Sequence, residues 1–267
     1  MELKLETIAV ERPAEGVVVA TLDRPERYNS MTVTMFRELE QLGFALGDDD
    51  EARVLILTGA GKAFCAGYDL DDAEELASLS ALGMLERQEH AARGLQAIRS
   101  LRIPVIAAVN GAAAGGGLSL ALAADIRIAS RSAKFNAAFV RIGLSAGDLG
   151  ASWLLPRVIG PALASELAYT GRFVFAEEAE RIGLVNKAVE DEKLLDEAID
   201  MAKLICANSP GGVQLSKRAI QANMEITSYA AALELENRGQ ALLTRGADMP
   251  EALAAFKEKR APKFTGR

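Results

Sequence analysis

Short apolar segments alternate with longer amphipathic stretches over residues 1–160. The longer stretches predict helices from Thr32 to about Leu46, over Met84–Leu101 and over Gly115–Ala123. The short segments are rich in β-branched residues and predict strands at Val17–Leu22, Val54–Thr58, Val105–Val109 and Ile126–Ala129. Apolar strands that alternate with helices are typical of an α/β fold with a buried sheet.

Beyond residue 160 the pattern is mainly helical. Helical spacing of apolar residues predicts helices at Ala162–Tyr169, Ala176–Ile182, Lys193–Ala207, Val213–Asn223, Tyr229–Leu243 and Pro250–Lys259. Only Leu184–Val189 is strand-like in this part of the chain. We therefore predict an α/β core over residues 1–160 and a helical region over residues 161–267.

Charge and cysteine content narrow the possible partners. The net charge of −7 argues against a nucleic-acid partner and against an anionic membrane surface, because both require a basic face. The uncharged stretch Ile103–Ala124 contains Pro104 and three adjacent glycines, which disfavour a membrane helix. Only two cysteines, Cys65 and Cys206, and no export signal indicate a protein of the reducing cytoplasm.

The sequence offers few groups for histidine or metal chemistry. His90 is the only histidine, which argues against a Ser-His-Asp triad and against a multi-histidine zinc site. Asp69, Asp71 and Asp72 are close enough in sequence to suggest a metal, but acids at a helix start more often interact with the helix dipole. We expect no metal.

Two glycine-rich loops follow predicted strands and are the main candidates for chemistry. Residues 57–70 and residues 109–119 place glycines and alanines where a ligand could approach the backbone. The second loop leads into a helix, whose first N–H groups favour a negatively charged oxygen. The spacing matches neither the dinucleotide-binding nor the P-loop pattern. An ordinary strand-to-helix connection is the alternative for the first loop.

The order of these segments resembles the crotonase superfamily, that is, the enoyl-CoA hydratase/isomerase family. The resemblance rests on segments in family order: 22–29, 63–70, 107–117, 123–127, 171–185 and 256–264. It implies an acyl-CoA enzyme with a twisted spiral core of ββα units. It also implies a homotrimer or a dimer of trimers, with the helical region serving oligomerisation and pocket closure. No cofactor is implied beyond the coenzyme A of the substrate.

The resemblance also implies functional positions. The backbone N–H groups of Tyr68 and Gly116 correspond to the family's oxyanion hole, which stabilises a thioester enolate. The positions implied to bind coenzyme A are Arg24, Ala63, Ala66, Asp69, Leu70 and Lys259. Ordinary surface charge is the alternative for the two cations in that set.

The sequence departs from hydratases at both acid–base positions. Ser119 and Phe139 stand where hydratases carry glutamates, and neither can act alone as a base near neutral pH. Asp148 resembles the aspartate of dienoyl-CoA isomerases, so isomerisation through Asp148, aided by Ser119 or a water, is favoured over hydration. A helix N-cap is the alternative role for Asp148. A non-catalytic acyl-CoA binding or carrier protein is the alternative function.

The apolar acyl chain also needs a pocket. Phe139 and Trp153 are the candidates to line it, and plain core packing is the alternative for both.

Overall fold

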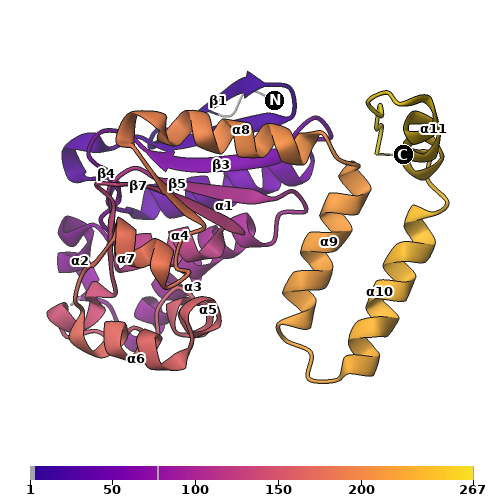
Figure 1. Ribbon diagram of the computed structural model, residues 1–267. Helices are drawn as coiled ribbons and strands as arrows, with labels where there is room; N and C mark the ends of the chain where they lie inside the picture. Colours follow the sequence, from indigo (N-terminus) through magenta and orange to yellow (C-terminus); the bar gives the residue numbers. More distant parts are fainter. Residues whose placement is uncertain (1–3, 77, 267) are drawn as a thin grey trace.

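The computed structural model describes residues 4–76 and 78–266. The larger of its two sheets has six strands in the order β1-β2-β3-β5-β7-β10 (Figure 1). β1 pairs antiparallel with β2, and every later neighbour is parallel. The strands span Ile8–Ala14 (β1), Val17–Leu22 (β2), Val54–Gly59 (β3), Val105–Val109 (β5), Ile126–Ser130 (β7) and Lys187–Val189 (β10). The four strands predicted for the core are confirmed, and β1 is an addition.

Both faces of this sheet are buried. Helices α1 (Val33–Gly47), α3 (Ala81–Arg99) and α4 (Gly116–Ala123) pack on one face, where they contribute to the larger apolar cluster. α8 (Leu194–Cys206) covers the other face and belongs to a second cluster (Figure 1). Double coverage explains why the central strands are apolar at nearly every position.

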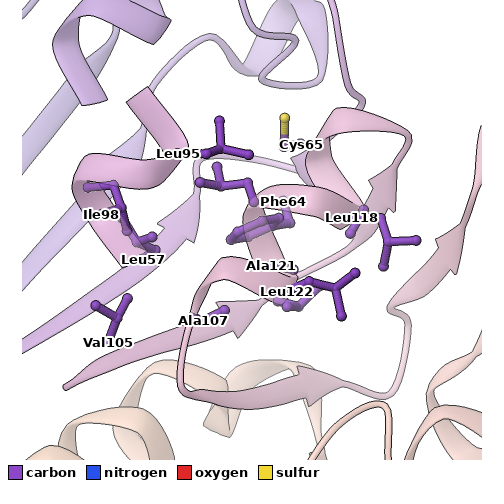
Figure 2. Close-up of a cluster of buried hydrophobic side chains, with 14 of the residues drawn as sticks. Leu57, Phe64, Cys65, Leu95, Ile98, Val105, Ala107, Leu118, Ala121 and Leu122 are labelled. Carbon is purple, nitrogen blue, oxygen red and sulfur yellow. The ribbon is translucent and has the colours of Figure 1, made fainter. Parts of the chain in front are cut away.

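Phe64 anchors the short strand within the first glycine-rich loop. Its side chain is fully buried, and Figure 2 shows it at the centre of a cluster with Leu57 of β3 and with Leu118 and Ala121 of α4. Burying an aromatic ring of this size contributes about 1.5–3 kcal/mol of hydrophobic stabilisation. The packing therefore fixes the end of the first loop's strand against the helix that follows the second loop.

A smaller sheet of very short strands carries both loops. Its order is β4-β6-β8-β9, and β4 and β8 both pair parallel with β6. These strands span Ala63–Cys65 (β4), Ala112–Ala114 (β6), Lys134–Asn136 (β8) and Val174–Phe175 (β9). Segments of two or three residues are too short to show a hydrophobic period, so the sequence pattern did not predict them.

The sheets extend past the boundary predicted at residue 160. β9 pairs with β8, and β10 pairs with β7, so strands from both predicted regions share each sheet. Short helices surround the sheets: α2 (Leu70–Leu76), α5 (Ala151–Ile159), α6 (Pro161–Thr170), α7 (Ala176–Arg181), η1 (Pro25–Arg27), η2 (Ala138–Ile142) and η3 (Asp191–Lys193). Residue 77, which follows α2, lies outside the described residues.

The last part of the chain forms a helical arm. α9 (Pro210–Asn223) and α10 (Tyr229–Leu243) lie side by side, and α11 (Asp248–Glu258) follows at the end of the arm (Figure 1). Buried Lys217 of α9 attaches the arm to the core, since its Nζ lies 2.8 Å from a carboxylate oxygen of Asp125 and donates to the Ile103 carbonyl, also at 2.8 Å. No described helix is long and apolar enough to cross a membrane.

Candidate active site

The first glycine-rich loop presents the backbone N–H of Tyr68. Met31 pairs with this loop, because its N–H donates to the Gly67 carbonyl at 2.7 Å and its carbonyl accepts from the Asp69 N–H at 3.0 Å. The Tyr68 amide between these two bonds faces away from Met31, as alternate residues do in extended pairing. Within residues 4–76 and 78–266, nothing accepts a hydrogen bond from it.

The second loop presents the N–H of Gly116. Gly115 has a φ of 51° and donates to the Asn136 carbonyl at 3.0 Å, so the chain turns sharply into α4. Gly116 is the first residue of that helix, and its amide has no intrahelical acceptor. Its N–H also has no acceptor among the residues the structure describes.

The two loops touch. A methyl group placed on Gly67 would lie 2.8 Å from the Ala114 carbonyl oxygen and 3.4 Å from the Gly116 amide nitrogen. Gly67 also has a φ of 101°, a conformation that side-chain-bearing residues rarely adopt. A methyl group on Gly117 would collide with the Cys65 carbonyl. Glycine at these positions therefore lets the Tyr68 and Gly116 amides lie on neighbouring stretches of backbone.

A buried carboxylate braces the first loop. Asp69 is 2% exposed and accepts hydrogen bonds from Arg24 Nη1 at 2.8 Å, from Ser30 Oγ at 2.8 Å and from Arg27 Nη2 at 3.2 Å. Burial alone would raise the pKa of Asp69, but these bonds and the Asp71 N–H outweigh it and hold that pKa well below its usual range. Arg24 and Asp69 are thus joined to each other, and they connect the loop to residues 24–30.

The other positions predicted for coenzyme A are not all brought together. Ala63 is buried in β4, and its carbonyl accepts from Asn29 Nδ2 at 2.7 Å. Ala66 and Leu70 are exposed in the second half of the first loop. Lys259 ends α11, which Figure 1 places on the arm and away from β4. Within one chain, the structure therefore does not place Lys259 with the other five positions.

Asp148 lies next to the second loop. Its side chain is half-buried, which raises the pKa of its carboxyl above the ordinary value, with a smaller opposing effect from the Leu149 N–H. Ser119, fully buried in α4, donates from Oγ to the backbone carbonyl of Asp148 at 3.3 Å. The serine thus holds the Asp148 backbone near α4 and makes no bond to its carboxylate.

The capping role considered for Asp148 is wrong. The residue that caps α5 is Gly150, with a φ of 82°, and no side chain caps this helix end. The Asp148 carbonyl accepts the Ala151 N–H at 2.9 Å, so its main chain closes the turn and its carboxylate does not bind the helix N-terminus. The carboxylate is left available for other chemistry.

The two aromatic residues predicted for the acyl pocket have different surroundings. Phe139 is 4% exposed, and its Cε1 would lie 3.7 Å from a methyl group placed on Gly115, so its ring closes the space beside the second loop. The Trp153 ring instead has the Arg157 guanidinium 3.7 Å and the Arg99 guanidinium 5.4 Å from its centroid. That cationic setting favours Phe139 over Trp153 as an apolar lining residue.

Sequence reasoning missed two residues that shape the loops. Buried Asn29, with a φ of 56°, accepts from the Arg24 N–H at 2.9 Å and donates to the Ala60 and Ala63 carbonyls. Asparagine tolerates this left-handed conformation better than most residues, so the residue type was the one sign in the sequence of a special backbone position. Leu149 has a φ of 47°, and no sequence pattern predicts a leucine there because the conformation costs about 1–2 kcal/mol.

The remaining candidate groups have ordinary structural surroundings. Burial raises the pKa of the Cys65 thiol to about 12, which suits a packing role and not a nucleophile. His90 is exposed on α3. Among the described residues, no three histidine, cysteine, aspartate or glutamate side chains gather as metal ligands.

Comparison with known sequences agrees with the family resemblance seen in the sequence motifs. The profile of the enoyl-CoA hydratase/isomerase family matches residues 12–267. A probable enoyl-CoA hydratase of Mycobacterium tuberculosis is 44% identical over 268 residues, covering 97% of this chain and 92% of the relative. The 1,2-epoxyphenylacetyl-CoA isomerase of Escherichia coli is 43% identical over 256 residues, covering 95% of this chain and 96% of the relative. Relatives with hydratase and isomerase names are thus about equally similar.

Solved structures agree on the fold. A putative enoyl-CoA hydratase from Streptomyces coelicolor superposes with a TM-score of 0.95 at 38% identity, covering 100% of this chain and 97% of that chain. An enoyl-CoA hydratase from Bacillus anthracis gives a TM-score of 0.93 at 36% identity, covering 98% of this chain and 100% of that chain. The predicted crotonase fold is therefore confirmed.

Proposed function

Because this chain belongs to the enoyl-CoA hydratase/isomerase family and is an enzyme of that type, we propose that it moves a double bond along the acyl chain of a CoA thioester. Asp148 serves as the single base in this scheme. The Tyr68 and Gly116 amides hold the thioester oxygen, and Phe139 lines the acyl pocket. No cofactor is needed beyond the coenzyme A of the substrate.

The proposed chemistry needs one carboxylate. Asp148 removes a proton from the carbon next to the thioester, and the electron pair of that C–H bond moves to the carbonyl oxygen. The two amides stabilise the resulting negative charge, and one such donor is typically worth about 10²–10³ in rate. Asp148 then returns the proton two carbons farther along the chain, so that no atom is gained or lost.

The position of Asp148 carries the proposal. The Ser119–Asp148 hydrogen bond holds this half-buried residue beside the helix that begins at Gly116. The two positions where hydratases carry glutamates hold Ser119 and Phe139, which leaves Asp148 as the base. A relative named 1,2-epoxyphenylacetyl-CoA isomerase, at 43% identity, supports isomerisation of an acyl-CoA without stating which bonds move.

The test is isotope exchange during turnover. A 3-enoyl-CoA incubated with the protein in D₂O should be converted to the 2-enoyl isomer. Mass spectrometry then measures the deuterium gained, which reports how often the proton held by Asp148 exchanges with solvent before it is returned. Conversion of a 2-enoyl-CoA to the 3-hydroxyacyl-CoA, with the 3-enoyl-CoA left unchanged, would favour hydration. Neither product and no exchange, with binding intact, would contradict the proposal and favour the binding-protein alternative.

The raised pKa of Asp148 predicts a shifted pH profile. The carboxylate must be deprotonated to accept a proton, so kcat/KM should fall as the pH drops through the pKa of Asp148. Since burial raises that pKa above the ordinary value of about 3.9, the acid limb should be centred above about pH 4. Initial rates measured between pH 4 and pH 9 check this, and a rate that stays flat down to pH 4 would contradict it.

We infer further that the helical arm serves assembly. α10 has no buried residue in a single chain, and it exposes apolar side chains, including Leu233, Leu235 and Leu242. A second copy packed against this helix would remove them from water. We therefore expect sedimentation equilibrium to show a trimer or a hexamer, and Leu242→Lys to shift it toward smaller species. A monomer at micromolar concentration would refute this.

A further inference from the structure

Leu149 has an unusual backbone conformation beside the candidate base. Its φ of 47° lies in the left-handed region, and Gly150 follows with a φ of 82°. A branched side chain in this region is uncommon and persists only where the surrounding structure holds it in place. Such residues gather at functional sites, so an observed outlier beside a candidate base calls for a functional explanation.

The Leu149 side chain packs against the second loop. A methyl group placed on Gly116 would lie 3.2 Å from Leu149 Cδ1 and 2.6 Å from Met31 Cε. These two side chains therefore occupy the space against the Gly116 Cα. Leu149 also packs on the main apolar cluster and is only partly exposed. The Leu149 side chain thus reaches from the position next to Asp148 to the Cα of Gly116, the residue whose amide is assigned to the thioester oxygen.

We propose that Leu149 is a specificity-determining residue whose side chain keeps water out of the space between Asp148 and Gly116, and so directs the site toward double-bond migration. The inference rests on the function proposed above.

Hydration has a requirement that double-bond migration lacks: a water oxygen must bond to the β carbon while the base accepts a proton from that water. The π electrons then move to the carbonyl oxygen, and the base delivers its proton to the α carbon.

Polar groups that could hold such a water are already present. Ser119 Oγ donates to the backbone carbonyl of Asp148 at 3.3 Å, so the Ser119 hydroxyl lies beside the residue that carries the candidate base and precedes Leu149. An ordered water needs about 2–4 polar partners and about 30 Å³ of space. The four carbon atoms of a leucine side chain fill more than that space. The side chain at position 149 is therefore the feature that decides whether water enters.

Leu149→Gly is the informative variant because it removes the side chain without disturbing the backbone path. Glycine adopts a positive φ freely, so Asp148 should keep its position. Leu149→Met keeps an apolar side chain of similar length and serves as the matched variant. Leu204→Ala, which shortens an exposed leucine on α8 at the far face of the sheet, controls for nonspecific effects.

The experiment follows both products from one 3-enoyl-CoA substrate in H₂¹⁸O. Leu149→Gly should raise the ratio of ¹⁸O-labelled 3-hydroxyacyl-CoA to migrated product at least about tenfold, as expected for a pocket altered by a few methylene groups. Leu149→Met and Leu204→Ala should keep the wild-type ratio. If Leu149→Gly does not fold, Leu149→Ala is measured with the same expected rise.

Three outcomes would overturn the inference. An unchanged product ratio in a folded Leu149→Gly or Leu149→Ala variant, with migration intact, shows that Leu149 does not control water. An equal rise in Leu149→Met shows that any change at this position has the same effect. A wild-type enzyme that neither migrates the double bond nor exchanges deuterium overturns the proposed function itself, and the two failures are thus told apart.

Discussion

Asp148→Asn should lower kcat by about 10³, because removing a positioned general base typically costs about 10²–10⁴ in rate. Asparagine has nearly the same shape and cannot accept the substrate proton at neutral pH. The Asp148 backbone carbonyl still accepts from Ser119 and Ala151, so the loop should keep its path. Steady-state kinetics together with acyl-CoA affinity, measured by titration calorimetry, check the prediction.

The matched control for this variant is Asp50→Asn, which neutralises an exposed aspartate in the loop after α1. It should retain wild-type kinetics. The Asp148→Asn variant should bind acyl-CoA within a few-fold of wild type, because its effect lies on the chemical step. A loss of affinity in parallel with the loss of rate would assign Asp148 to binding, and near-normal turnover would remove it from the mechanism.

Gly67→Ala should lower kcat/KM by about 10²–10³, the value of one oxyanion donor. The added methyl group would lie 2.8 Å from the Ala114 carbonyl, and the φ of 101° would strain any residue with a side chain. Relief of either effect should displace the backbone that carries the Tyr68 amide. Kinetics on the same substrate, with thermal melting to confirm folding, measure the effect.

Gly47→Ala is the control glycine, because nothing lies within 4 Å of a methyl group placed there. It should leave activity unchanged and leave the melting temperature unchanged or slightly higher. If Gly67→Ala kept full activity with a normal melting temperature, the amide of Tyr68 would not be a donor to the thioester oxygen. The acyl-CoA site would then have to be sought elsewhere in the fold.

Hydrophobic pattern predicted the elements whose burial is regular. The strand at Val17–Leu22 and the helix at Tyr229–Leu243 match the structure residue for residue, and Thr32 accepts from the Met35 N–H as an N-cap should. β1 was missed because it is an edge strand with an exposed, charged outer part that includes Glu11 and Arg12. Its pairing with β2, and not its composition, makes it a strand.

The candidate site was predictable in part. Motif resemblance located the two loops, and the structure shows their backbones in contact at Gly67 and Gly116. The motif resemblance did not show that Asp69 binds Arg24, since an ion pair between residues 45 positions apart depends on tertiary packing. The sequence also gave no indication that Leu149 is unusual. Its positive φ is held by contacts with neighbouring residues, against the backbone preference of leucine.

The buried Asp69 cluster has a consequence for ligand recognition. Two arginines and a serine hold the first loop in place through charge-assisted hydrogen bonds made during folding. The conformational entropy of this loop is therefore lost before any thioester arrives. Under the proposed function, association then requires little ordering of the backbone assigned to the thioester carbonyl, and more of the contact energy remains as net affinity. Preorganisation of this kind suits a site whose task is to stabilise a short-lived anion.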